Sequence, residues 1–140
     1  MKILIAADGS GHTRRMLAYL AAHDEWLGPR HQYTVLTVTP QLPAHAASIV
    51  GRGACQSYYD EQIEDVFKPI RAFFAQKGLD AAYEGRVGHA AAVIAETADQ
   101  GRYDLVMLGS HGHGALGNLV LGSVATQVLA RCGTPVLIVR

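Results

Sequence analysis

The strongest constraint on the fold is the alternation of five short apolar runs with four segments of helical periodicity. Strands that are apolar on both faces are typical of a parallel sheet with helices on its two sides. The pattern predicts an α/β chain with a doubly wound, Rossmann-like, five-stranded parallel sheet. The expected strands are residues 2–7, 33–39, 82–87, 105–108 and 136–139, and the expected helices are 13–27, 58–74, 89–100 and one starting near 123.

Two segments interrupt this regular pattern. Residues 40–54 carry small side chains and two glycines, so we expect a loop that forms a lid or is disordered. Pro69 lies inside the apolar stripe of residues 58–74 and should kink or divide that helix.

Composition limits the class of protein. A chain of 140 residues has the length of one domain, which we expect to span residues 1–140. Its 12 Lys and Arg balance 12 Asp and Glu without any basic block, which argues against nucleic-acid binding. No apolar stretch approaches the roughly 20 residues that cross a bilayer, and Asp8 comes too early for a signal peptide.

We therefore expect a cytoplasmic protein without membrane association. The two cysteines, Cys55 and Cys132, have no CxxC spacing. Reduced thiols are the first interpretation, and one disulfide is the alternative.

A glycine-rich segment lies between the strand expected at 105–108 and the last helix. It contains Gly109 and Gly112, then nine residues, and then Gly122 followed by Ser123. Glycines allow the backbone to approach an anion closely, and the free N–H groups of a helix's first turn point at it. This order predicts a phosphate cradle, with residues 113–121 arching over the anion.

Gly122 decides where the last helix begins. A helix that continued through Gly122 would lose about 1 kcal/mol relative to alanine at that position. A break there, with Ser123 as the N-cap, leaves the N–H groups of Val124 and Ala125 free for phosphate. The alternative is a glycine kept for close packing of the helix on the sheet.

The loops that follow parallel strands meet at the carboxyl edge of the sheet, where ligands bind near the topological switch point. Asp8 falls in the first such loop, either as a ligand contact or as a helix-terminal residue that serves its own turn. Surface side chains are the ordinary interpretation of four histidines in these loops, so no metal site is expected. They are His12, His89, His111 and His113.

The spacing G-x2-G-x9-G-S, formed by Gly109, Gly112, Gly122 and Ser123, resembles the ATP-binding signature of the universal stress protein family. The likeness extends over essentially the whole chain. The opening strand and its Asp-Gly-Ser turn, the start of the last helix and the final strand are all similar to the family pattern.

The resemblance implies a sheet order of 3-2-1-4-5, a homodimer, and ATP as ligand, with ADP or AMP as alternatives. Asp8 would contact the ribose and adenine region, the backbone near Val38 the adenine, and the glycines with Ser123 the ribose and phosphates. Mg²⁺ would bind through phosphate oxygens. The predicted binding residues are Ala7, Asp8, Val38, Gly109, His111, Gly112, His113, Gly122, Ser123 and Val124.

The sequence departs from the family pattern at two places. His113 stands where members often carry Arg or Lys, and histidine side chains gain positive charge mainly below neutral pH. We therefore expect tighter ATP binding at about pH 6 than at about pH 8. Ala6-Ala7 replaces a bulkier or proline-containing approach to the aspartate, which would alter the adenine pocket.

The first functional interpretation is a stress-response or regulatory protein that uses nucleotide occupancy as a switch by ordering residues 40–55 and 109–121 over the ligand. One alternative is a slow ATPase or phosphotransfer enzyme. The candidate loops offer one carboxylate and no P-loop lysine, so no catalytic residue is assigned. The other alternative is a nucleotide-free dimeric interaction module. In a homodimer the apolar edge strand Val136–Val139 would pair with its copy.

Overall fold

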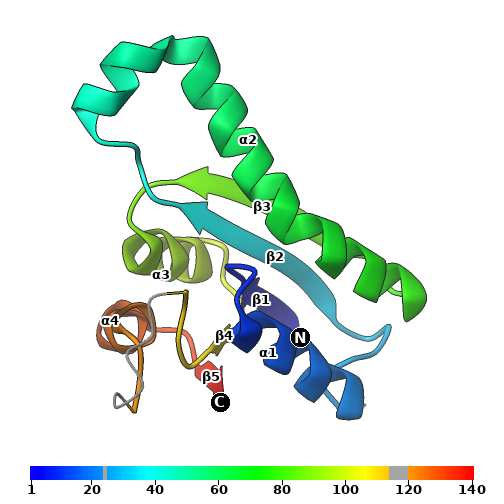
Figure 1. Cartoon of the computed structure of the whole chain (residues 1–140). Helices are drawn as coiled ribbons and strands as arrows, with labels where there is room; N and C mark the ends of the chain where they lie inside the picture. The colour runs from blue at the N-terminus through cyan, green and yellow to red at the C-terminus, as the bar shows by residue number, and fades with distance from the viewer. Residues whose placement is uncertain (24, 114–119) are drawn as a thin grey trace.

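The computed structural model describes residues 1–23, 25–113 and 120–140, and it shows a twisted sheet between two layers of helices (Figure 1). Strands and helices alternate along the chain. In order, the elements are β1 (Lys2–Ala6), α1 (Gly11–Ala22), β2 (Gln32–Thr39), α2 (Ala44–Gln76), β3 (Ala81–Val87), α3 (Ala90–Gln100), β4 (Leu105–Gly109), α4 (Ser123–Arg131) and β5 (Val136–Val139).

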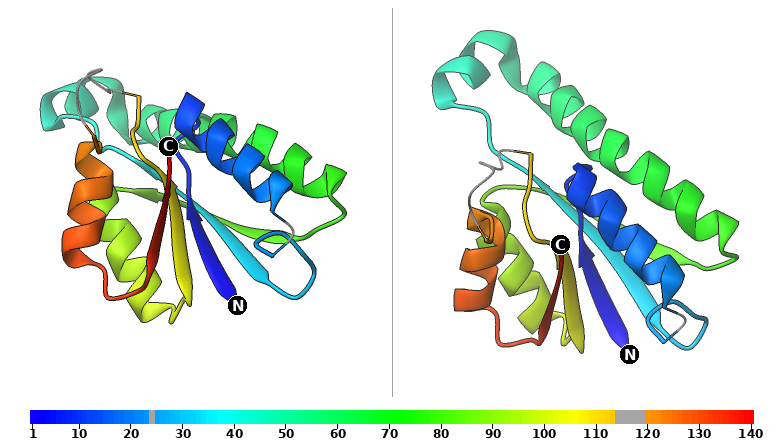
Figure 2. Two further views of the ribbon diagram at one scale, coloured as in Figure 1. Left: turned by 90° about the horizontal axis from the view of Figure 1, so that it is seen from below. Right: turned by 60° about the horizontal axis from the view of Figure 1, so that its bottom comes forward.

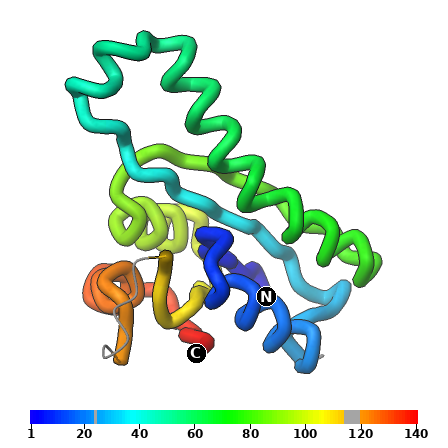
Figure 3. The backbone as a smooth tube through the Cα atoms, in the orientation of Figure 1, coloured from blue at the N-terminus to red at the C-terminus, as the bar shows by residue number. Residues whose placement is uncertain are grey.

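All five strands are parallel and lie in the order β3-β2-β1-β4-β5. β1 is central, with Ile5 in register with Val35 of β2 and Met107 of β4. The chain winds from β1 towards β3 and then returns across the sheet to β4, so the winding direction reverses between β1 and β4 (Figure 3). The predicted doubly wound sheet and its order are confirmed.

Helices α1 and α2 cover one face of the sheet, and α3 and α4 cover the other (Figure 2). Successive side chains of β1 point to opposite faces of the sheet, and they contribute to a separate hydrophobic core on each face. Ile3 and Ile5 pack with side chains of α1 and α2, whereas Leu4 and Ala6 pack with side chains of α3 and α4. Because both faces are buried, the strand is apolar from Ile3 to Ala6, and only Lys2 at its start is charged.

Helix α1 ends at Ala22, five residues before the end expected from the sequence. The side chain of Tyr33 holds the turn that follows. Its hydroxyl donates to the carbonyl oxygen of Trp26 at 2.9 Å and accepts from the N–H of Gly28 at 2.8 Å. These bonds satisfy backbone groups that lie outside the helix.

The expected loop at residues 40–54 is wrong, because α2 already begins at Ala44. Three of the small residues that suggested a loop are alanines in the first turn of this helix. Alanine has the highest intrinsic helix propensity, so they favour a helix here. The interruption lies at Gly51, whose φ of 81° and ψ of 165° are not helical. The first turns of α2 therefore form an arm that projects beyond the sheet (Figure 1).

Pro69 does not divide α2. Gly51 is the position at which the backbone of this element leaves helical geometry, and the helix runs on past Pro69 to Gln76. The apolar residues around the proline explain why the helix is kept. Phe67, Ile70 and Phe74 are almost fully buried against the sheet, so their burial outweighs the lost hydrogen bond.

Cys55 and Cys132 are both free thiols and partly buried, so the disulfide left open by the sequence is not formed. Within the described residues, no helix combines the length and the apolar character required to span a bilayer.

Asp99, near the end of α3, holds the turn between α4 and β5. Its carboxylate accepts hydrogen bonds from the N–H groups of Gly133 and Thr134, both at 3.2 Å, and from the Thr134 hydroxyl at 3.0 Å. These bonds, first among them the one from the Gly133 N–H, hold the pKa of Asp99 below its ordinary value.

We expect Asp99 to contribute its full stabilisation above the ordinary carboxyl pKa of about 4 and to lose it as the pH falls through its lowered folded-state pKa. The folded protein favours the charged carboxylate more than the unfolded chain does, which gives this sign. Asp99→Asn should lower the melting temperature at neutral pH and weaken the acid dependence. Thermal unfolding at several pH values measures both effects, with the exposed Asp65→Asn as control. Identical pH profiles for Asp99→Asn and wild type would contradict this role.

Candidate functional site

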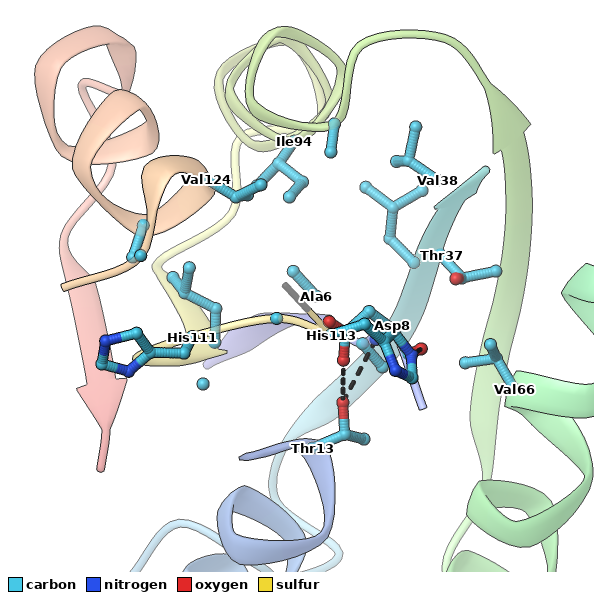
Figure 4. A pocket seen from close by; sticks show the side chains of 18 of the residues that line it. Ala6, Asp8, Thr13, Thr37, Val38, Val66, Ile94, His111, His113 and Val124 are labelled. Carbon is cyan, nitrogen blue, oxygen red and sulfur yellow. Dashed lines mark hydrogen bonds between the residues drawn. The ribbon is translucent and has the colours of Figure 1, made fainter. Parts of the chain in front are cut away.

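A cavity of about 450 Å³ opens at the carboxyl edge of the sheet, where the winding direction reverses (Figure 4). Its volume is within the range of small-molecule sites. The ends of β1, β2 and β4, the start of α4 and the sides of α2 and α3 surround it. All ten residues predicted to bind the nucleotide line this cavity: Ala7, Asp8, Val38, Gly109, His111, Gly112, His113, Gly122, Ser123 and Val124.

Helix α4 begins at the cavity wall. Gly122 is the N-cap and Ser123 the first helical residue, so the expectation that Ser123 is the N-cap is wrong by one residue. The first helical hydrogen bond of α4 runs from the Thr126 N–H to the Gly122 carbonyl oxygen. The N–H groups of Ser123, Val124 and Ala125 precede this bond and have no acceptor inside the helix. The start of α4 can therefore donate several hydrogen bonds to an anion in the cavity.

Two glycines in the cavity wall lie close to their neighbours, and a side chain on either would force an adjustment. A β-carbon on Gly109 would be 2.6 Å from the β-carbon of His12, and one on Gly122 would be 3.1 Å from the carbonyl oxygen of Ser110. The N–H of Gly122 also donates to that oxygen at 2.7 Å. Gly122 therefore also allows close packing against Ser110, as the alternative interpretation expected. The predicted arch at 113–121 falls mostly outside the described residues.

Asp8 follows β1, and its two carboxylate oxygens have different surroundings. Oδ1 accepts hydrogen bonds from the Ser10 N–H and the Thr13 hydroxyl, both at 2.9 Å. Oδ2 lies 2.8 Å from the position that a β-carbon on Gly112 would take. Asp8 thus stabilises its own turn, as one interpretation expected, and also presents its second oxygen to the glycine-rich segment.

His113 connects two loops across the cavity. Its Nε2 donates to the backbone carbonyl oxygen of Asp8 at 2.6 Å, since a carbonyl oxygen can only accept. The bond ties the segment that follows β4 to the end of β1, and the imidazole lies over Asp8 in Figure 4.

The other three histidines expected at this edge do not all lie together: His12 and His111 meet at Ser110, and His89 lies apart from them. Ser110, 1% exposed, has its hydroxyl oxygen 3.0 Å from Nδ1 of His111 and 3.4 Å from Nδ1 of His12. His89 is the N-cap of α3, and neither it nor His12 lines the cavity. In the parts of the chain that the structure describes, no three His, Cys, Asp or Glu residues are arranged to hold a metal ion.

The sequence matches the profile of the universal stress protein family over residues 1–140. The chain belongs to this family. A universal stress protein from Thermus aquaticus is 32% identical over 146 residues, which cover 99% of this chain and 97% of the relative. Universal stress protein Slr1230 from Synechocystis is 29% identical over 139 residues, which cover 99% of this chain but 42% of that protein. The chain therefore spans about two-fifths of the length of that relative.

Solved structures of universal stress proteins show the same fold. UspA from Lactobacillus plantarum superposes with a TM-score of 0.78 at 19% identity and covers 100% of this chain and 97% of its own. A family protein from Arabidopsis thaliana with AMP bound gives a TM-score of 0.66 at 15% identity, with 99% and 90% covered. A universal stress protein in complex with cAMP gives 0.56 at 23% identity, with 100% and 96% covered.

The remaining walls of the cavity in this universal stress protein are largely apolar. Figure 4 shows Ile94 and Val124 on one side and Val38 and Val66 on the other, with Asp8 between them. A flat, uncharged group fits such a slot better than a charged one, because burying an unpaired charge is costly.

Several lining residues were not predicted from the sequence. Thr37 is a buried polar residue near the carboxyl end of β2, and Gln62 and Val66 lie one turn apart on α2. The placement of Thr37 near the carboxyl end of β2 is a signal that could have identified it. The two α2 residues could not be found in this way, because the distance between α2 and the end of β1 depends on tertiary packing.

Proposed function

We propose that this universal stress protein binds an adenine nucleotide in the cavity and acts as a regulator whose state depends on nucleotide occupancy. The observation that carries the proposal is the juxtaposition of a helix start rich in free N–H groups, a glycine-rich segment, and an apolar slot in one cavity. Phosphate, ribose and base each require one of these surroundings.

In this proposal the N–H groups of Ser123, Val124 and Ala125 bind phosphate oxygens. Gly109 and Gly112 allow the backbone to come close to the same phosphate. Asp8 Oδ2 accepts a hydrogen bond from a ribose hydroxyl, as its position beside the glycine-rich segment permits.

The adenine would lie between the apolar walls and contact the backbone near Val38, which supplies hydrogen-bonding groups at the end of β2. His111 and Ala7 complete the wall on either side of the phosphate and ribose positions. The AMP and cAMP found in the two solved relatives support an adenine nucleotide as the ligand. Of ATP, ADP and AMP, the di- and triphosphate would carry Mg²⁺ on phosphate oxygens.

Occupancy would act as a switch through the segments that surround the cavity. The bond from His113 to the Asp8 carbonyl oxygen joins two of them, and a ligand held between Gly112 and α4 would add further contacts to both. The ligand would bind more tightly to the state in which these segments contact it, and occupancy would therefore raise the population of that state. We place this activity in the cytoplasm, which agrees with the two free thiols.

The experiment that tests the proposal is identification of small molecules released from freshly purified, denatured protein by mass spectrometry. An adenine nucleotide in stoichiometric amount is the expected result, with Gly122→Val protein as the matched control that should carry none. Release of no nucleotide, combined with no calorimetric binding of added AMP or ATP, would contradict the proposal.

We further propose a homodimer in which β5 pairs with its copy. β5 has β4 on one side, and three of its four side chains remain partly exposed. An exposed apolar edge strand tends to be covered by another strand. Size-exclusion chromatography with light scattering should give twice the 15.0 kDa mass of the chain at micromolar concentration. A monomer under these conditions would contradict the pairing.

A further inference from the structure

We propose that the cavity selects adenine nucleotides that carry a single phosphate over ATP. This inference rests on the proposed nucleotide binding and specifies the class of ligand. Its basis is the distribution of charge around the cavity, whose lining, within the described residues, provides partial positive charge from backbone dipoles and no Lys or Arg side chain.

The lining described by the structure contains one formally charged side chain, the carboxylate of Asp8, and no Lys or Arg. The segment that joins β4 to α4 supplies none either, because the sequence has no Lys or Arg between Arg102 and Arg131. ATP carries more negative charge than AMP or cAMP, and each added charge in a partly buried site needs a compensating partner.

The carboxylate of Asp8 further disfavours ATP relative to nucleotides with a single phosphate. Its Oδ2 lies beside Gly112, which belongs to the same glycine-rich segment as the phosphate cradle. The repulsion between a carboxylate and a phosphate grows with the phosphate charge and is weakly screened in a cavity. A ribose hydroxyl, by contrast, can donate a hydrogen bond to the same oxygen.

His113 is the side chain best placed to offset this charge, but it already has a partner. Its Nε2–H points at the carbonyl oxygen of Asp8 and is 2.6 Å from it, so this donor is used within the protein. Rotating the ring towards a phosphate would break that bond.

The helix start supplies the positive potential that remains. A helix N-terminus is equivalent to roughly half a unit of positive charge, and its effect falls off within the first turn. The three N–H groups at Ser123, Val124 and Ala125 can surround the oxygens of one phosphate. This potential matches a single phosphate at the start of α4 and leaves further phosphates without donors.

Isothermal titration calorimetry with adenosine, AMP, cAMP, ADP and ATP tests the inference, each with Mg²⁺ and with a chelator. With the chelator, we expect AMP or cAMP to bind about tenfold or more tightly than ATP, a difference of about 1.4 kcal/mol. With Mg²⁺ the difference should be smaller, because the bound ion offsets negative charge on the ATP phosphates. The AMP and cAMP titrations show which form of the single phosphate is preferred. ATP binding as tightly as the monophosphates in the presence of the chelator would overturn the selectivity while leaving the nucleotide site intact. Absence of binding by all five would overturn the proposed function itself.

Two variants at one position separate charge from shape. His113→Lys places an ammonium group beside Asp8 and should shift the ratio of ATP to AMP affinity by about tenfold in favour of ATP. His113→Gln keeps a hydrogen-bond donor without charge and should leave the ratio near that of wild type. Melting temperatures verify that both variants fold, and an unchanged ratio in folded His113→Lys protein would overturn the charge explanation.

Discussion

Gly122→Val is expected to reduce AMP affinity by about 100-fold or more, because a branched side chain against Ser110 and His111 would displace the start of α4, which we propose holds the phosphate. The backbone of Gly122 is extended, with φ −71° and ψ 165°, so valine can adopt it. The obstacle is space, because even a β-carbon there would be 3.1 Å from the Ser110 carbonyl oxygen and the α-carbon of His111. Calorimetry with AMP measures the loss.

A second glycine provides the control for this variant. Gly53 lies in α2, and a β-carbon on it would meet no atom within 4 Å. Gly53→Ala should leave AMP affinity unchanged and stabilise the helix by about 0.5–1 kcal/mol. Wild-type affinity in folded Gly122→Val protein would contradict the placement of phosphate at the start of α4.

Asp8→Asn is expected to weaken AMP binding by about tenfold, because a hydrogen bond to a charged acceptor is stronger than one to a neutral amide. The asparagine oxygen can still accept from the Ser10 N–H and the Thr13 hydroxyl, so the turn after β1 should be kept. ATP should lose less affinity than AMP, since the variant also removes the charge that opposes its phosphates.

The matched control is Asp65→Asn, which makes the same change of charge on an exposed part of α2 outside the cavity. Calorimetry with both nucleotides, together with melting temperatures of the three proteins, measures the effect. Equal AMP affinity in Asp8→Asn and wild type would show that this carboxylate does not contact the nucleotide.

The sheet could be predicted from the sequence because its central strands are buried on both faces. Ile3, Leu4 and Ile5 are fully buried, and such uninterrupted apolar runs are difficult to place elsewhere in a parallel α/β fold. The glycine-rich segment could also be located, because glycines next to an expected strand end and an expected helix start are a local feature of the chain.

Other parts depend on tertiary contacts that a local pattern does not contain. The turn after α1 is held by the hydroxyl of Tyr33, which lies in the next strand. The mixture of alanines and glycines at the start of α2 predicts a loop, whereas in the structure Gly51 alone interrupts the helix. Gln62 reaches the cavity through the packing of α2 on the sheet.

The bond between His113 and the Asp8 carbonyl oxygen was also outside what the sequence could show. It joins residues 105 positions apart, and the sequence allowed only the statement that both belong to loops at the same edge. The imidazole of His113, which we expected to meet phosphate, is therefore hydrogen-bonded to the backbone instead.

A crystal structure of the protein grown with AMP tests the nucleotide site most directly. We expect the phosphate within hydrogen-bond distance of the N–H groups of Ser123 and Val124, the ribose at Asp8, and the base between Val38 and Ile94. AMP bound instead in the groove between β3 and α3, beside Arg86 and Tyr103, or a cavity closed by side chains in the presence of saturating AMP, would contradict it.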